Sequence, residues 1–159
     1  MKIQFNHNVT IQDSMVFENI FEPELKYDTP EEKEEEIGEF IRLYMFVDDK
    51  IVGEIYAADV EKLYEDEPDF ADIDRYLGRK AVYLHSTAIL PEYQDKGLGK
   101  ILKAYFHGYL KGLGYEMVIG LSTSPQMNKV NDLFGVIWIT EHENWYDTGR
   151  IAKFYEVKL

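Results

Sequence analysis

The chain has 159 residues, which suits one globular domain with a real core, and its 45% apolar content excludes a disordered protein. It has no cysteine, which excludes disulfides, thiolate metal sites and a cysteine nucleophile, and is compatible with a reducing compartment. The formal net charge of −13 argues against nucleic acid and anionic membranes as partners and favours cationic ones, although such a charge also serves solubility alone.

The N-terminal part carries no targeting signal that we recognise. Its first residues, MKIQFNHNVTIQDS, lack the apolar stretch of a secretory signal. No apolar run reaches the roughly 20 residues that are needed to span a bilayer. We therefore expect a soluble, cytoplasmic protein. Residues 10–21 and 29–40 are predicted to form short helices, with Pro30 in the first turn of the second.

Residues 41–58 predict a β-hairpin, because two apolar runs flank Asp48, Asp49 and Lys50. Residues 60–77 predict a polar, helical insertion. Acidic residues gather at Glu31 to Glu36 and again at Glu61 to Asp74. These two clusters are either solvated helix faces or a rim that attracts an amine-bearing substrate.

The next part predicts a strand over residues 81–90, a helix after Gly97 and Gly99, and a short buried strand over 116–121. The predicted buried face of the helix carries Leu98, Ile101, Leu102, Tyr105, Phe106, Tyr109, Leu110 and Leu113. Lys100, Lys103 and Lys111 fall largely on the other side. Strand, helix and strand together form a βαβ unit, whose two strands are expected to be parallel.

The remaining residues predict a helix around 125–134 and two strands, one within 135–142 and one within 150–159. With no internal repeat and no low-complexity linker, we expect one domain over residues 1–159. It would comprise a helical and acidic part (1–39), a core (40–134) and C-terminal strands (135–159).

The loop between the predicted strand and helix, LPEYQDKGLGK, has the chemistry of an anion site. Gly97 and Gly99 allow a ligand to approach the backbone closely, and the N–H groups at a helix start favour a phosphate. Lys96 and Lys100 add positive charge, and Gln94 offers an amide donor. A glycine turn without any ligand remains the alternative for the two glycines taken by themselves.

Two common phosphate-binding patterns do not fit this loop. A nucleoside triphosphatase needs a hydroxyl after Gly99-Lys100, and Ile101 stands there. A dinucleotide fold needs a third glycine where Leu102 stands, and an acid after the next strand, which ends in Leu121 and Ser122.

The stretch PEYQDKGLGKIL resembles motif A of the GNAT superfamily of N-acetyltransferases, in which a Gln or Arg is followed by G-x-G or G-x-A at a helix start. The preceding segment, Ile89-Leu90-Pro91-Glu92-Tyr93, also resembles the hydrophobic-x-Pro-Glu-Tyr segment that many members of this superfamily carry before motif A. The resemblance covers about residues 40–134. It implies a single α/β domain with a mixed central sheet, splayed around a CoA-binding cleft and flanked by helices.

The resemblance further implies that acetyl-CoA is the cosubstrate. Its pyrophosphate would lie on the backbone amides of residues 96–100, and its pantetheine arm would pair with the strand. The residues assigned to it are Ile89, Leu90, Gln94, Asp95, Lys96, Gly97, Leu98, Gly99, Lys100, Asn128 and Asn131. The two asparagines could instead be polar surface or caps of their helix.

The family's usual general acid, a tyrosine near the end of the helix after the fifth strand, has no counterpart here. By spacing, Phe134 stands in its place, and a phenyl ring has no hydroxyl to protonate the leaving thiolate. Tyr146, Tyr155 or a water could substitute.

A base is also needed, because an ammonium has no lone pair with which to attack a thioester. On the strand before the loop, Tyr83, His85, Thr87 and Ile89 share one face by alternation. His85 is the first candidate, because an imidazole titrates near neutral pH. Glu54 on the preceding strand is the second. The alternatives are a structural histidine and a solvent-facing strand acid. No residue spacing suggests a metal site.

These observations predict an acetyl-CoA-dependent N-acetyltransferase that works by direct attack, since no nucleophile for an acyl-enzyme is evident. The acceptor would be a small amine, a polyamine, or a protein lysine or N-terminus, and a homodimer is left open. The alternative is a catalytically impaired CoA-binding protein whose acidic surface docks a protein partner.

Overall fold

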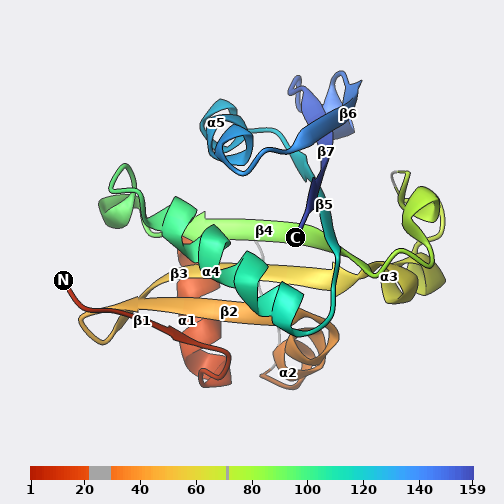
Figure 1. Ribbon diagram of the computed structural model, residues 1–159. Coiled ribbons are helices and arrows are strands. Elements are labelled where there is room, and N and C mark those ends of the chain that lie inside the picture. Colours follow the sequence, from red (N-terminus) through yellow and green to blue (C-terminus); the bar gives the residue numbers. More distant parts are fainter. Residues whose placement is uncertain (22–29, 71) are drawn as a thin grey trace. The chain divides into compact units, whose positions relative to one another are not determined.

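The computed structural model describes residues 1–21, 30–70 and 72–159 (Figure 1). The chain divides into two compact units, Met1–Ala57 with Ser86–Phe106, and Ala58–His85 with His107–Leu159. We call them unit 1 and unit 2 and describe each by itself. Strand β4 (Ala81–Ile89) and helix α4 (Leu98–Gly112) contribute residues to both units.

Unit 1 is built on an antiparallel arrangement of strands. Its elements are β1 (Ile3–Asn6), α1 (Ile11–Phe21), α2 (Pro30–Glu39), β2 (Ile41–Val47), most of β3 (Lys50–Asp59), the end of β4 and the start of α4. Strand β2 pairs antiparallel with β1 and with β3. Between β2 and β3, Asp48 and Asp49 have φ values of 48° and 68°, which is the geometry of a tight two-residue hairpin turn. The predicted hairpin is confirmed.

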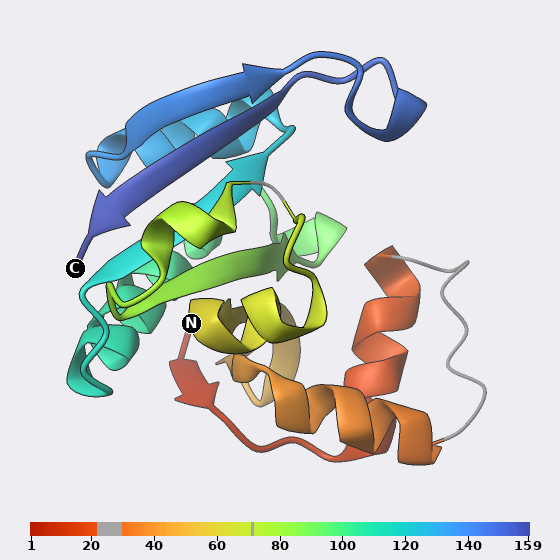
Figure 2. The same ribbon diagram turned by 90° about the vertical axis from the view of Figure 1, so that its right-hand side faces the viewer.

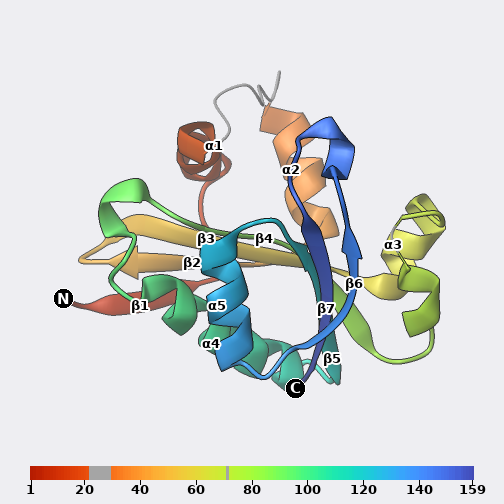
Figure 3. The same cartoon turned by 90° about the horizontal axis from the view of Figure 1, so that it is seen from above.

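Helices α1 and α4 cover opposite faces of β2 and β3 in unit 1 (Figures 1 and 3). The side chains of the strands alternate accordingly. The hydroxyl of Tyr44 on β2 is hydrogen-bonded to Ser14 of α1 at 2.7 Å, whereas Gly53 on β3 faces Leu102 of α4. Helix α2 packs beside α1 (Figure 2). Of the acidic run Glu31 to Glu36 on α2, the side chains of Glu31 and Glu34 are exposed, and the others lie outside the described residues.

Unit 2 holds the parallel pair. Its elements are α3 (Val60–Asp66), a 3-10 turn (Ile73–Tyr76), the start of β4, the end of α4, β5 (Met117–Ser122), α5 (Pro125–Leu133), β6 (Ile137–His142), a 3-10 turn (Trp145–Asp147) and β7 (Ala152–Lys158). Strand β4 pairs parallel with β5, from Ala81 opposite Met117 to Leu84 opposite Gly120. Strand β7 lies antiparallel between β5 and β6 (Figure 2). The predicted βαβ unit and the α/β class with a mixed sheet are confirmed, while the single domain over 1–159 stays a prediction.

The buried face of α4 is narrower than the sequence predicted. Leu98, Leu102, Phe106 and Leu110 are buried, which follows a strict spacing of four. Ile101, Tyr105 and Leu113 are substantially exposed, so their place on the buried face was wrong. Tyr105 is half-exposed, and its ring stacks on Phe5 of β1 at 4.0 Å between centroids.

Lys103 is the larger surprise, because the sequence pattern placed it on the solvent side of α4. It is only 1% exposed. Periodicity cannot tell on which edge of an apolar stripe a long side chain lies, because the aliphatic stem of lysine packs well against apolar neighbours. Burial disfavours the charged ammonium and lowers the pKa of Lys103 to about 8.

Replacing this lysine by Lys103→Met should raise the free energy of unfolding at pH 7 by about 1–3 kcal/mol, because about 1.4 kcal/mol accompanies each unit of pKa shift. In the unfolded chain the lysine titrates near 10.4. Between about pH 8 and 10.4 the unfolded state therefore holds more protons, and the stability of the native protein should rise with pH. Urea unfolding at neutral and alkaline pH measures both effects. A variant that is less stable at pH 7 and keeps the rise would contradict this assignment.

Candidate functional site

The loop that joins β4 to α4 has the backbone geometry of an anion cradle. Asp95 and Gly97 have φ values of 59° and 76°, and the first α-helical hydrogen bond runs from Ile101 N–H to the Gly97 carbonyl at 3.2 Å. The N–H groups of Leu98, Gly99 and Lys100 therefore lie in the first turn, where a helix supplies no acceptor. A Cβ on Gly97 would meet no atom within 4 Å, so the backbone at this position can be approached closely.

The loop is held to β4 by its own groups. The Gln94 side-chain amide donates to the Ile89 carbonyl at 2.9 Å, and Leu90 N–H donates to the Val52 carbonyl of β3 at 2.8 Å. The Leu90 carbonyl accepts from Tyr93 N–H at 2.8 Å. Both main-chain groups of Leu90 are thus engaged within unit 1, and only the second lone pair of its carbonyl is left for a ligand. Sequence reasoning assigned Gln94 to a phosphate, and here the same amide fixes the loop.

Lysines surround Tyr93 on this loop. Lys50, from the β2–β3 hairpin, pairs with Glu92 at 2.9 Å, and Lys96 donates to the Glu92 carbonyl at 2.9 Å. Both ammonium groups lie over the Tyr93 ring, at 5.4 Å and 5.2 Å from its centroid. The hydrogen bond from Lys50 lowers the pKa of Glu92, and the same bond raises the pKa of Lys50. The pair is exposed, so it orders the surface near the loop more than it stabilises the fold.

Gly53 of β3 lies against the end of β4, so we expect Gly53→Ala to disturb that strand. An added Cβ would lie 2.7 Å from Ile89 Cδ1 and 3.2 Å from the Ala88 carbonyl oxygen. The variant should lose about 1–3 kcal/mol of stability, as overpacked cores do, and should bind CoA more weakly because Ile89 must move. The control is Gly108→Ala on α4, where a Cβ meets nothing within 4 Å and helix propensity improves. Thermal unfolding and CoA calorimetry check both variants, and a Gly53→Ala protein as stable as Gly108→Ala would refute the expectation.

In unit 2 the first candidate base belongs to an aromatic cluster. His85 is exposed on β4, and its ring lies at 4.8 Å, edge to face, from Tyr83. The ring of Tyr83 also packs edge to face with the ring of Phe70, at 5.1 Å between centroids. Burial raises the pKa of Tyr83, as does its interaction with Tyr146. The structure therefore places an exposed imidazole beside a buried phenol.

Tyr146, the first candidate acid, stands on the turn between β6 and β7. It is 75% exposed and has a left-handed φ of 48°, which is uncommon for an aromatic residue. Its ring lies edge to face with Trp145 at 4.8 Å. Tyr155, the other phenol considered, is buried, and burial raises its pKa. Of the two, Tyr146 is the one that a substrate can reach from solvent.

Helix α5 carries the remaining candidates. Ser124 caps the helix by accepting from Met127 N–H at 3.3 Å. The side-chain oxygen of Asn128 is buried without a hydrogen-bond partner among the described residues, as expected of a group that receives a ligand donor. Asn131 is fully buried, which excludes the polar-surface interpretation for it. Phe134 ends the helix and packs edge to face on His107 at 5.0 Å.

Glu54, the second candidate base, is not a solvent-facing strand acid, because it is 3% exposed. It forms a buried ion pair with Arg42, which also binds Glu18 of α1 at 2.9 Å and stacks on the Tyr56 ring at 4.3 Å. This network ties α1 to β2 and β3. An arginine partner stabilises the carboxylate, so Glu54 has a structural explanation that the sequence did not reveal.

The structure thus groups the candidates by unit. Ile89, Leu90 and the Gln94–Lys100 loop lie together in unit 1, with Glu54 on a neighbouring strand. His85, Tyr146, Asn128 and Asn131 belong to unit 2. Sequence reasoning missed the roles of Arg42 and Lys50. Alternation along β2 places Arg42 on the same face as Tyr44, but no pattern in the sequence shows which strand acid it meets.

Two kinds of feature are absent from the described parts of the chain. Across residues 1–21, 30–70 and 72–159, no helix has both the length and the apolar character that crossing a membrane requires. Among the same residues, no three His, Asp or Glu side chains are grouped so that they could hold a metal ion.

Comparison with known proteins agrees with this geometry. The family described as "Acetyltransferase (GNAT) family" matches residues 10–134, and no curated protein sequence matches significantly. Among solved structures, an acetyltransferase of the GNAT family from Streptococcus pneumoniae has a TM-score of 0.75 at 15% identity, over 99% of each chain.

Two further solved structures are similar in fold. A GNAT superfamily phosphinothricin acetyltransferase from Sinorhizobium meliloti, in complex with AcCoA, has a TM-score of 0.74 at 18% identity, over 100% of this chain and 89% of that one. The polyamine N-acetyltransferase of Drosophila melanogaster has a TM-score of 0.71 at 13% identity, over 99% and 100%. At such identities the structures establish the fold alone, whereas the family match extends over most of the chain. This chain therefore belongs to the acetyltransferase (GNAT) family.

Proposed function

We propose that this protein transfers the acetyl group of acetyl-CoA to a primary amine by direct attack. The observation that carries the proposal is the β4–α4 loop, where the left-handed Asp95 and Gly97 precede a helix start that is open to an anion. Acetyl-CoA fits such a cradle through its pyrophosphate. The phosphinothricin acetyltransferase of similar fold was solved with AcCoA, which supports the same cosubstrate here.

In unit 1, the main-chain N–H groups of Leu98, Gly99 and Lys100 would bind the pyrophosphate, with Lys96 and Lys100 adding positive charge. Gln94 would hold the loop in place rather than contact the phosphate, because its amide donates to the Ile89 carbonyl. Ile89 and Leu90 would carry the pantetheine arm. In unit 2, the partnerless side-chain oxygen of Asn128 would accept a hydrogen bond from the same cosubstrate.

In the chemical step, His85 would take a proton from the acceptor ammonium, and the neutral nitrogen would attack the thioester carbon. The C–N bond forms and the C–S bond breaks. The leaving thiolate takes a proton from Tyr146, and the new amide nitrogen returns its surplus proton to the Tyr146 oxygen. The proton on His85 goes to water, so the enzyme is regenerated. No acyl-enzyme is needed, which agrees with the absence of cysteine from the chain.

A second candidate function is a CoA-binding protein that has lost this chemistry and docks a partner through its acidic surface. Phe134 favours it, since this residue stands in the family's tyrosine position and packs on His107. The net charge of −13 would attract a cationic protein partner, just as it would attract a cationic acceptor of the enzyme. For either function, we propose that the protein is cytoplasmic.

The two functions are separated by product analysis. The protein is incubated with acetyl-CoA and, in turn, an alkylamine, spermidine, a lysine peptide and a peptide with a free N-terminus. Mass spectrometry then identifies any N-acetylated product. One acetylated amine supports the enzyme, and no acetylated product with any acceptor, in a protein that binds CoA, supports the binding protein.

A further inference from the structure

Two groups of aromatic side chains in unit 2 include the candidate base and the candidate acid. On and near β4, the ring of Tyr83 packs edge to face with His85 at 4.8 Å and with Phe70 at 5.1 Å between centroids. On the β6–β7 turn, Trp145 packs edge to face with Tyr146 at 4.8 Å. Burial raises the pKa of Tyr83, and the Tyr146 phenol raises it further, so the two groups are neighbours. We call these five side chains the aromatic cluster.

The turn that carries Trp145 and Tyr146 is held in an uncommon shape by its own hydrogen bonds. Asn144, Tyr146 and Asp147 have φ values of 51°, 48° and 57°, which residues other than glycine rarely adopt. Trp145 N–H donates to the Arg150 carbonyl at 2.9 Å, and the Asn144 side-chain amide donates to the Asp147 carboxylate at 3.1 Å. Such backbone strain is often found where a site holds a ligand. Tyr146 is thereby presented to solvent, with 75% of its surface exposed.

The charges around the aromatic cluster favour a cation. Among the described residues, the cation–π contacts lie at other rings, such as Lys153 over Trp138 at 5.7 Å. After burial and Tyr146, the exposed carboxylate of Glu67 is a further cause of the raised pKa of Tyr83, which places an acid near the cluster. A cation is attracted by the face of an aromatic ring, and a nearby carboxylate adds to this attraction. The cluster therefore offers ring faces and an acid to a cation from outside the chain.

The candidate base is itself a member of the aromatic cluster, so an acceptor whose amine reaches His85 has the other rings beside it. On this basis, which rests on the proposed function, we infer that the aromatic cluster binds a second cationic group of the acceptor. The acceptor is then a primary amine joined by a short chain to a distal ammonium, guanidinium or quaternary ammonium group. The distal cation contacts the rings of Trp145 and Tyr146, while the reacting amine lies at His85.

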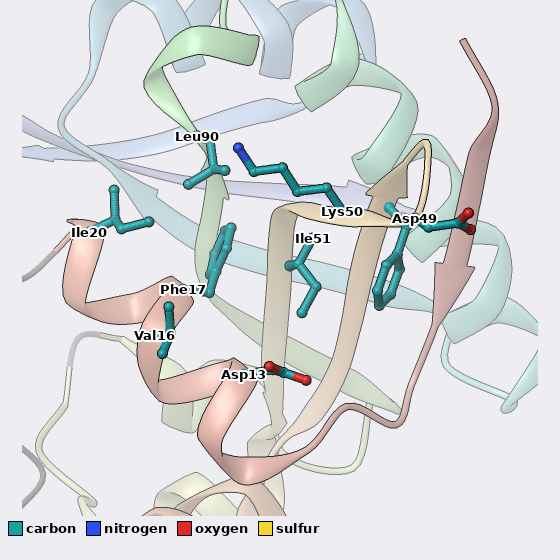
Figure 4. Close-up of a pocket in the computed structure, with 9 residues that line it drawn as sticks. Asp13, Val16, Phe17, Ile20, Asp49, Lys50, Ile51 and Leu90 are labelled. Atoms are coloured by element: carbon teal, nitrogen blue, oxygen red, sulfur yellow. The ribbon is translucent and has the colours of Figure 1, made fainter.

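A cavity beside α1 is a separate feature of the molecule. It lies in unit 1, has a volume of about 280 Å³ and is lined by residues of α1 and of the β2–β3 hairpin and by Leu90 (Figure 4). Its lining includes none of the five side chains of the aromatic cluster. A ligand bound there would therefore not depend on the ring of Trp145.

The test uses pairs of acceptors that differ in the charge of the distal group. In each pair, a primary amine is joined by two to six methylenes either to a trimethylammonium group or to a tert-butyl group, its neutral isostere. At the chain length that fits best, kcat/KM should be about 5- to 30-fold higher for the cation, the equivalent of about 1–2 kcal/mol. A third series carries a phenyl group instead. Equal values within every pair, or a phenyl series above the cationic one, overturn the inference.

The distal charge also changes the pKa of the reacting amine, so the ratio within each pair is compared between variants. Trp145→Leu removes one ring face and should reduce the preference for the cation about two- to fivefold. The matched control is Trp138→Leu, because Trp138 is the other tryptophan of the chain and lies on β6 of unit 2, outside the cluster. It should keep the preference. The same preference in wild type and Trp145→Leu, or an equal loss in both variants, overturns the inference.

A binding measurement separates this inference from the proposed function. Choline has a quaternary ammonium group and no amine to acetylate, and the alcohol in which carbon replaces its nitrogen is the neutral isostere. Ligand-observed NMR is carried out with both compounds on the protein without acetyl-CoA. Choline binding that exceeds that of the alcohol in wild type and Trp138→Leu, and is lost in Trp145→Leu, supports the cation site even if no amine is ever acetylated. Choline that binds no better than the alcohol, in a protein that acetylates primary amines, overturns the cation site and leaves the proposed function standing.

Discussion

The Gly97→Glu variant is expected to lose CoA binding while keeping its fold. The new carboxylate would stand where the backbone is open and where the pyrophosphate is proposed to lie. Like charges in close contact cost several kcal/mol, so the dissociation constant should rise by roughly 100-fold or more. Isothermal titration calorimetry with CoA measures this directly.

The backbone cost of this substitution needs its own control, because a side chain at a φ of 76° is strained in itself. Gly78→Glu supplies it, with a φ of 74°, no atom within 4 Å of the new Cβ, and a position in unit 2 outside the proposed phosphate site. It should lose comparable stability and bind CoA normally. CoA affinity that is unchanged in Gly97→Glu, or equally reduced in both variants, would remove the loop from the site.

The second large effect is expected for His85→Ala. If His85 takes the proton of the acceptor, its loss should lower kcat by roughly 10²–10⁴-fold, the range typical of general-base removal. The amine must be deprotonated before it attacks, so wild-type kcat/KM should rise with pH through an apparent pKa. The variant should lack that titration and leave CoA affinity unchanged.

His7→Ala is the control for the loss of a histidine, because His7 lies in unit 1 and is hydrogen-bonded to the Arg42 carbonyl at 2.9 Å. It should keep both the rate and the pH profile. A His85→Ala protein with wild-type turnover and the same profile would return His85 to a structural role within the aromatic cluster. Glu54 would not then be the next choice, because its carboxylate is already paired with Arg42.

The parts of the fold that the sequence predicted are those set by local pattern. The Asp48-Asp49 turn, the strand before the loop and the helix after Gly97 and Gly99 depend on residues close together in the chain. The left-handed φ of Gly97 suits a residue without a Cβ, whereas the left-handed φ of Asp95 was not predicted from the sequence.

What the sequence could not predict depends on which distant side chains meet. Lys103 is buried although its position in the helical pattern is polar, and Arg42 of β2 forms ion pairs with Glu54 of β3 and Glu18 of α1. The pairing of Gln94 with the Ile89 carbonyl likewise changes the role of a motif residue, from phosphate donor to support of the loop. Alternation and helical spacing name a face but not its partner.

Phe134 occupies the family's tyrosine position, and we propose that this GNAT protein nevertheless acetylates an amine. The rate of CoA thiol release by the wild-type protein measures this activity, with acetyl-CoA saturating and an alkylamine, spermidine or a peptide amine as acceptor. Release that depends on the amine and is lost in Gly97→Glu is expected. Tight CoA binding with no amine-dependent thiol release for any of these acceptors would refute the acetyltransferase.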